Sequence, residues 1–273
     1  MNKTFQKIFA KAKAENRSCF VAFVTGMDPD YESSKQILIE LSKYCSVLEV
    51  GVSFNTSTSD SSIIMSANDR AIKSGARTEK IFQLIKEVKS EITSDTAFVT
   101  MGYLNQIHVY GIDKYIKDCK KSGVDGCIVV DSNNESPEDE LIFKGLTKND
   151  IAFIKLIAPT NDSAYIKQSL KKCSSWVYIV SYAGVTGSKD VNLENVKKLT
   201  KMIRKQSNIP IGVGFGVKTL EDVKKVSKLA DLVVCGSNIV ERIKEGSQNG
   251  LSGQNLAHFV SEYVINLAKG VKH

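Results

Sequence analysis

Short apolar runs alternate with amphipathic segments along most of the chain. The runs are rich in β-branched and aromatic residues, which is typical of buried strands. There are eight of them, at Cys19 to Thr25, Val47 to Val52, Thr96 to Gly102, Gly126 to Val130, Phe153 to Ile157, Val177 to Val180, Ile211 to Gly214 and Leu232 to Cys235. In the segments between them, apolar residues recur near the i, i+3, i+4 spacing of a helix. Six such segments are Tyr31 to Tyr44, Thr78 to Lys89, Gly111 to Ser122, Ser163 to Lys172, Leu193 to Gln206 and Leu220 to Leu229.

Strict alternation of strand and helix favours parallel strands, because each helix carries the chain back to the start of the next strand. Eight repeats in 273 residues predict one (β/α)₈ barrel, the TIM-barrel fold, as a single domain over residues 1–273. We expect an extra helix before the first strand, over Asn2 to Glu15, and a short one after the eighth, over Asn238 to Glu245. The alternative is an open doubly wound sheet, which usually has fewer strands and a GxGxxG first turn. The first turn here, Thr25 to Pro29, lacks that motif.

Composition and charge argue against a nucleic-acid-binding protein and a membrane protein. The formal charge of +7 comes from lysines scattered over the helical segments, and no basic tract is interleaved with aromatics. Nucleic acid is therefore not an expected partner, whereas the charge suits an anionic metabolite. No apolar stretch approaches the roughly 20 residues that cross a bilayer, and the charged start, Met1 to Arg17, has no apolar signal core. The six cysteines show no CxxC spacing, so we expect a cytoplasmic protein with reduced thiols.

A glutamate stands alone in the apolar run Val47 to Val52, and Asp60 follows eleven residues later in a polar loop, Ser53 to Ser62. An unpaired buried carboxylate is costly, so Glu49 indicates a function. Glu49 would lie within the second strand near its carboxyl end and Asp60 in the loop that follows, where catalytic groups of such barrels stand. A carboxyl group with a raised pKa beside an ionised one can divide acid and base roles. The alternatives are that Glu49 pairs with a buried base or hydroxyl, and that Asp60 only shapes a turn.

Three strand ends in the last third of the chain are rich in glycine. They read Gly184-Val185-Thr186-Gly187, Gly212-Val213-Gly214-Phe215-Gly216 and Gly236-Ser237. Glycines let backbone N–H groups approach an anion, and Ser237 would open a helix whose N-terminus favours negative charge. Barrels frequently bind phosphate in the loops after strands seven and eight. The pattern favours a phosphate site over glycines that serve turns alone.

Other polar residues give weaker signals. Tyr178 could face the barrel mouth and contact a substrate, or be a core tyrosine with a satisfied hydroxyl. Lys155, inside the fifth run, could form a Schiff base as in a class I aldolase, but a lysine that pairs with a buried acid is the favoured interpretation. His108, His258 and His273 have no partners at metal-ligand spacing, so we predict no metal site.

The ordered motifs of the chain closely resemble those of the tryptophan synthase alpha chain family. The resemblance covers almost the whole sequence and includes Ala22-Phe23-Val24-Thr25 with Asp28-Pro29, Leu48-Glu49-Val50-Gly51-Val52 with Asp60, Tyr103-Leu104-Asn105, Val130-Asp131, Ala158-Pro159-Thr160, Gly184-Val185-Thr186-Gly187, Gly214-Phe215-Gly216 and Gly236-Ser237.

This resemblance implies a lyase that cleaves indole-3-glycerol phosphate, in the retro-aldol sense, to indole and glyceraldehyde 3-phosphate. It implies that Glu49 protonates the indole ring carbon and that Asp60 accepts or balances the indole N–H. Phosphate contacts would fall on Gly187, Gly216, Gly236 and Ser237, and Thr186 would belong to a lid that closes over the substrate. It also implies an α₂β₂ assembly with a beta chain that carries pyridoxal phosphate and receives the indole, while the alpha chain holds no cofactor.

The chain departs from the family pattern mainly in the loop Ser53 to Ser62. Prolines and a glycine usual there are missing, and Thr56 stands where the family has an aspartate. Gln106 and Asn133 replace two further prolines, and Gly26-Met27 reorders the first turn. Because the loop would contact the beta chain and position Asp60, its change motivates an alternative, a weak or inactive alpha-type subunit that regulates a beta chain. A Schiff-base aldolase that uses Lys155 is a second alternative.

Overall fold

Eight parallel strands close into a barrel in the computed structural model, which describes residues 2–55, 60–181, 191–214 and 216–272. The strands pair in chain order and β1 closes the ring against β8. They are β1 (Cys19–Thr25), β2 (Val47–Gly51), β3 (Ala97–Gly102), β4 (Gly126–Val129), β5 (Ala152–Ile157), β6 (Val177–Val180), β7 (Ile211–Gly214) and β8 (Leu232–Cys235). The predicted (β/α)₈ barrel is confirmed, and each strand lies within one residue of its predicted bounds.

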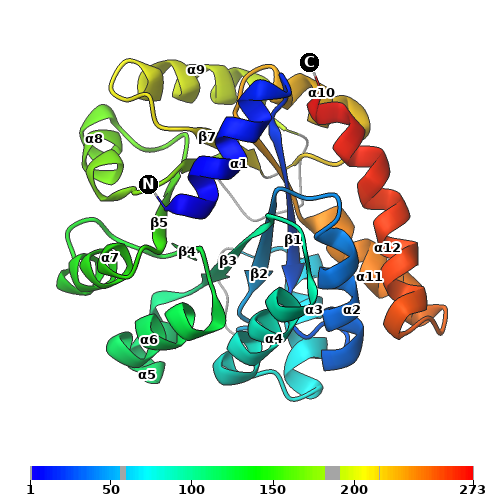
Figure 1. The fold of residues 1–273 in the computed structure, drawn as a ribbon. Helices are drawn as coiled ribbons and strands as arrows, with labels where there is room; N and C mark the ends of the chain where they lie inside the picture. The colour runs from blue at the N-terminus through cyan, green and yellow to red at the C-terminus, as the bar shows by residue number, and fades with distance from the viewer. Residues whose placement is uncertain (1, 56–59, 182–190, 215, 273) are drawn as a thin grey trace.

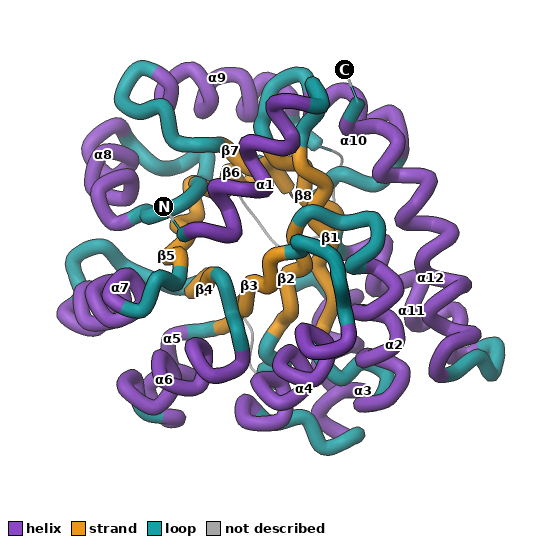
Figure 2. The backbone as a smooth tube through the Cα atoms, viewed as in Figure 1, coloured by secondary structure: helices purple, strands orange, loops and turns teal. Residues whose placement is uncertain are grey.

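Helices surround the barrel, as the purple ring around the orange strands in Figure 2 shows. In the described part of the chain they are α1 (Lys3–Ala14), α2 (Tyr31–Leu41), α3 (Ser62–Lys73), α4 (Thr78–Glu91), α5 (Leu104–Tyr110), α6 (Ile112–Ser122), α7 (Pro137–Lys148), α8 (Ser163–Lys172), α9 (Leu193–Arg204), α10 (Leu220–Ser227), α11 (Ser237–Gln248) and α12 (Gly253–Ala268), followed by a 3₁₀ turn, Lys269–Val271. The predicted helices are present. The helix after β8 is longer than predicted and continues past Glu245 to Gln248. Gly246 in this extension is buried against α12.

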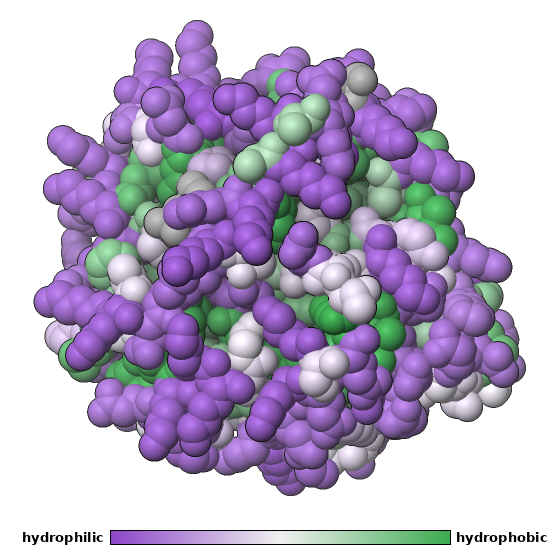
Figure 3. All heavy atoms as spheres, in the orientation of Figure 1, coloured by the Kyte–Doolittle hydropathy of each residue, from purple (hydrophilic) through white to green (hydrophobic). Residues whose placement is uncertain are grey.

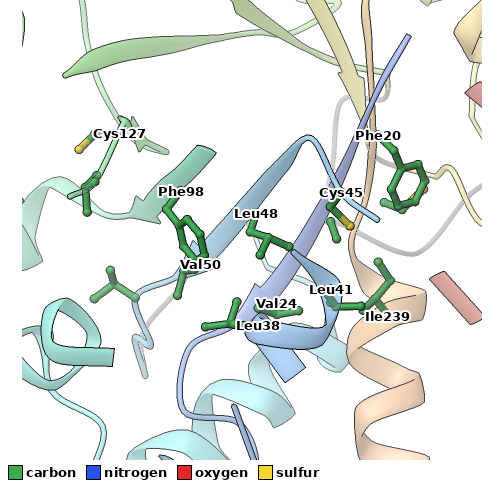
Figure 4. Packing of buried hydrophobic residues seen from close by; sticks show 14 of the residues in the cluster. Phe20, Val24, Leu38, Leu41, Cys45, Leu48, Val50, Phe98, Cys127 and Ile239 are labelled. Atoms are coloured by element: carbon green, nitrogen blue, oxygen red, sulfur yellow. The ribbon is translucent and has the colours of Figure 1, made fainter. Parts of the chain in front are cut away.

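Alternate residues of each strand face opposite sides of the barrel wall. One side fills the barrel interior with residues that include Val21, Val47, Val99, Ile154 and Trp176. The other side packs against the helices in a larger core, part of which Figure 4 shows: Leu48 and Val50 of β2 lie near Leu38 and Leu41 of α2. This alternation places Glu49 on the interior side, between two residues that face the helices.

Helix α1 covers the amino ends of the strands (Figure 1). Its side chains Phe5, Ile8 and Ala12 are buried with the residues of the barrel interior, and Thr4 donates a hydrogen bond to Asp125 at 2.7 Å. The face that carries α1 is mainly hydrophilic (Figure 3). The buried apolar side chains of α1 thus close the barrel at this end, while the outer surface stays polar.

The six cysteines are free and buried, as expected of thiols that serve as small apolar side chains. Among the residues that the structure describes, no helix is both long and apolar enough to cross a membrane.

Candidate active site

A pocket opens at the carboxyl ends of the strands and encloses about 760 Å³ of empty space, its open mouth included. Six residues predicted from the sequence line it together: Glu49, Asp60, Tyr178, Gly216, Gly236 and Ser237. Its apolar wall includes Phe23, Val52, Ile64, Met101 and Val130. A cleft at the mouth of a barrel that combines apolar walls with polar groups is the usual form of a small-molecule site.

Glu49 lies in the middle of β2, paired with Phe23 of β1 and Val99 of β3. It is 1% exposed, and neither carboxyl oxygen has a hydrogen-bond partner among the described residues. The alternative of a buried base or hydroxyl that satisfies Glu49 thus finds no support in this part of the chain. Burial raises the pKa of Glu49 to about 8, because the charged form would lose its hydration. At neutral pH the group is a neutral acid that faces the pocket.

Asp60 stands one residue before Ser61, the N-cap of α3, whose side chain accepts a hydrogen bond from the Ile64 N–H at 3.3 Å. The carboxylate of Asp60 accepts a hydrogen bond from Asn68 Nδ2 at 3.2 Å. Asn68 is 5% exposed and also lines the pocket. Sequence reasoning missed Asn68; the available signal was an asparagine, a poor helix former, in the segment that the structure shows to be α3.

Tyr178 lies on the interior face of β6 and is 4% exposed. Burial, and then the nearby Glu49 charge, raise the pKa of its hydroxyl well above the usual value, so the phenol stays neutral. Tyr178 stacks obliquely on Trp176, with 5.6 Å between ring centroids. Both rings pack in the barrel interior, and Tyr178 also lines the pocket.

Two glycines of β7 make room for these rings. A Cβ at Gly212 would lie 2.4 Å from the Trp176 ring, and a Cβ at Gly214 would lie 2.1 Å from Tyr178 Oη. Gly214 is not among the residues that line the pocket. The structure therefore explains Gly214 by the space that Tyr178 needs, whereas the sequence analysis placed it in the phosphate site.

Replacing Gly214 with alanine is expected to lower the free energy of unfolding by about 1–3 kcal/mol, the usual cost of overpacking a core. Denaturant unfolding checks this. In a Tyr178→Phe background the cost should shrink, because the closest clashing atom, the hydroxyl oxygen, is gone. An equal cost in both backgrounds would show that Tyr178 is not what Gly214 accommodates.

The loop after β7 and the N-terminus of α11 bring backbone groups to the pocket. Gly236 is the N-cap of α11, and no side chain caps the first turn of this helix among the described residues. Gly216, with φ of +84°, adopts a left-handed conformation that favours glycine. Helix N–H groups and a positive dipole end suit a phosphate here. Lys218 also lines the pocket and was missed from the sequence, where nothing distinguishes it from other lysines. Thr186 and Gly187, also predicted to bind substrate, lie outside the described residues.

Lys155 does not reach this pocket. It alternates with Ile154 and Leu156, which pack with the barrel interior, so its side chain points outward to the helices. There Nζ lies 2.9 Å from Asp139 Oδ1 of α7 and also bonds Ser132. Burial lowers the pKa of Lys155, and Asp139 opposes that effect. The favoured interpretation, a lysine paired with a buried acid, agrees with this geometry, and a Schiff-base role has no geometric support.

Within the described residues, no group of three or more His, Cys, Asp or Glu side chains could hold a metal ion. His108 and His258 are both exposed.

Comparison with known proteins agrees with the family resemblance of the sequence motifs. A family model described as tryptophan synthase alpha chain matches residues 9–269. The crystal structure of a tryptophan synthase subunit alpha from Legionella pneumophila is 25% identical over 99% of this chain and 98% of that chain, with a TM-score of 0.87. A structure from Aquifex aeolicus is 28% identical with complete coverage of both chains and a TM-score of 0.86. A chain from a Mycobacterium tuberculosis tryptophan synthase structure is 23% identical with complete coverage of both and a TM-score of 0.86, and it supports the fold alone.

Proposed function

Because this chain belongs to the tryptophan synthase alpha chain family, we propose that Glu49 and Asp60 are its catalytic acid and base. The family function is that of the alpha subunit in tryptophan biosynthesis, a lyase that cleaves indole-3-glycerol phosphate. The observation that carries the residue assignment is Glu49, a buried carboxyl group without a hydrogen-bond partner in the described structure, which faces the pocket and is protonated at neutral pH.

Cleavage needs a proton on the indole ring carbon that bears the glycerol chain. Glu49 donates that proton, and the positive charge moves to the ring nitrogen. The carbon–carbon bond then breaks, its electrons restore the aromatic ring, and the chain carbon becomes an aldehyde as its hydroxyl loses a proton. Glu49, now a carboxylate, can accept this proton and return to its starting state, so protons balance over one turnover. Its raised pKa suits both transfers near neutral pH.

Asp60 acts on the ring nitrogen. A carboxylate there accepts the N–H and balances the positive charge that forms when the ring carbon is protonated. Asn68 orients the carboxylate through its hydrogen bond. The phosphate group of the substrate binds Gly216, Gly236 and Ser237 at the N-terminus of α11, together with Thr186 and Gly187 as the family resemblance implies. The apolar wall that includes Phe23 and Met101 receives the indole ring.

We also assign a beta chain as the partner, in an α₂β₂ assembly in the cytoplasm, where the beta chain carries the pyridoxal phosphate and the alpha chain holds no cofactor. Membership of the tryptophan synthase alpha chain family supports this assignment. The altered loop, Ser53 to Ser62, favours a second candidate function. In this alternative the chain is an alpha-type subunit that regulates a beta chain without efficient cleavage.

Indole release from indole-3-glycerol phosphate by the isolated chain, measured against pH, tests the proposal. We expect cleavage that declines as the pH rises through about 8, because Glu49 then loses the proton that it must donate. Addition of a beta chain should raise the rate. Absence of cleavage with and without a beta chain would favour the regulatory subunit, and a rate that keeps rising above pH 8 would exclude Glu49 as the acid.

A further inference from the structure

Lys218 is the only lysine, arginine or histidine among the described residues that line the pocket. It lies in the loop after β7, two residues past Gly216. Gly216 also lines the pocket, and so do Gly236 and Ser237 at the N-terminus of α11. These three residues are the described ones to which the phosphate of the substrate is assigned. The single basic residue of the described pocket therefore belongs to a segment that also carries a phosphate contact.

The backbone of Lys218 is held by two helices. Its N–H donates a hydrogen bond to Asp222 Oδ2 of α10 at 3.1 Å, and its carbonyl oxygen accepts one from Tyr263 Oη of α12 at 2.9 Å. Asp222 is itself fixed, because it forms a capping box with Thr219. Both backbone polar groups of Lys218 are thus used within the protein, and the side chain is the part of this residue that can bring a polar group to a ligand.

Tyr263 also connects this loop with the start of α11. Burial raises the pKa of its hydroxyl, and a hydrogen bond with the Asn238 side chain partly opposes that shift. Asn238 is the second residue of α11 and lines the pocket. Because Lys218 O and the Asn238 amide both bond the same oxygen, they lie within roughly 6 Å of each other, twice the length of a hydrogen bond. Lys218 is therefore held close to the first turn of α11.

We propose that Lys218 is a specificity-determining residue whose ammonium group contacts the phosphate of the substrate. The proposal rests on the proposed function, because it concerns the phosphate subsite of the same pocket. A phosphate ester carries a charge of about −1.5 to −2 at pH 7, whereas a helix N-terminus supplies only a partial positive charge. A lysine adds a full charge on a flexible stem. Lys218 thereby favours the phosphorylated substrate over one that lacks the phosphate.

The first test is Lys218→Gln. The phosphate charge does not change while the carbon–carbon bond breaks, so Lys218 stabilises the bound substrate and the transition state equally. We therefore expect KM for indole-3-glycerol phosphate to rise about ten-fold, the usual size of a lost charged hydrogen bond, while kcat stays within about two-fold. Lys218→Arg keeps the charge and should keep most of the affinity. The matched control, Lys225→Gln, removes the same charge from the exposed surface of α10 and should leave both constants unchanged.

Indole-3-glycerol, which lacks the phosphate, isolates the contact. Its kcat/KM should be the same in the native chain and in Lys218→Gln. The ratio of kcat/KM for the phosphorylated substrate to kcat/KM for indole-3-glycerol should then fall about ten-fold in the variant. An unchanged ratio, through equal loss with both substrates or through loss with neither, would overturn the proposal.

Binding of inorganic phosphate gives a readout that does not depend on catalysis. Titration calorimetry should show a Kd about ten-fold higher in Lys218→Gln than in the native chain and in Lys225→Gln, and equal values would refute the contact. If the native chain releases no indole while phosphate binding responds as expected, the proposed function fails and the assignment of Lys218 stands.

Discussion

Replacement of Glu49 by glutamine is expected to lower kcat for indole release by about 10² to 10⁴, the usual contribution of a general acid. Glutamine has the size and the neutral charge of the protonated glutamate, so the pocket should keep its shape. It has no acidic proton to give to the ring carbon. The steady-state assay of indole release at neutral pH measures the change.

The same variant has a distinct effect on stability. Burial raises the pKa of Glu49 in the folded chain to about 8 from its ordinary value of 4.5, so between these values the folded state binds the proton more tightly than the unfolded state. Native stability therefore loses this contribution as pH rises through that window. Glu49→Gln lacks the titration, so its melting temperature relative to the native chain should increase over the same range.

The matched control is Glu40→Gln, since Glu40 is also a buried glutamate but lies on α2 and pairs with Lys43. It should keep the native kcat. If Glu49→Gln kept a tenth or more of the native kcat, Glu49 would not be the acid.

Replacement of Asp60 by asparagine is expected to lower kcat by about 10² to 10³, a loss typical of one electrostatic partner of the transition state. Asparagine can still accept the hydrogen bond from Asn68 Nδ2, so the side chain should keep its place. The lost quantity is the negative charge that balances the protonated indole ring. KM should change less than kcat, because this charge acts mainly after the ring carbon has been protonated.

Asp69→Asn serves as the control for Asp60→Asn, since Asp69 lies on the exposed side of α3 next to Asn68. Assays of both variants with and without a beta chain separate catalysis from partner coupling. Equal activity of the two variants would mean that Asp60 is not the base, and would favour a role for the loop in regulation.

The barrel itself was predictable from the sequence, because strand formation depends on local patterns. Each of the eight strands is a short β-rich run flanked by polar or glycine-containing segments, and a parallel sheet buried on both faces needs such continuous apolar runs. Glu49 was predictable for the same reason, since a single carboxyl group in an apolar run is visible without a fold. The glycines after the strands predicted the N-terminus of α11 as an anion site, through the local geometry of a helix start.

The tertiary structure decided how the residues meet. Asn68 was not singled out from the sequence and Gln106 was noted only as a replaced proline, but folding brings Asn68 to Asp60 and Gln106 to the exits of β2 and β3. Gly214 looked like part of a phosphate loop, but the ring of Tyr178 on the neighbouring strand explains it. The sequence also did not show that Lys155 points out of the barrel. Its pairing with Asp139 is known only from the folded structure. Sequence patterns report what one segment prefers, whereas contacts between distant segments depend on strand register and closure of the sheet, and these arise only when the whole core packs.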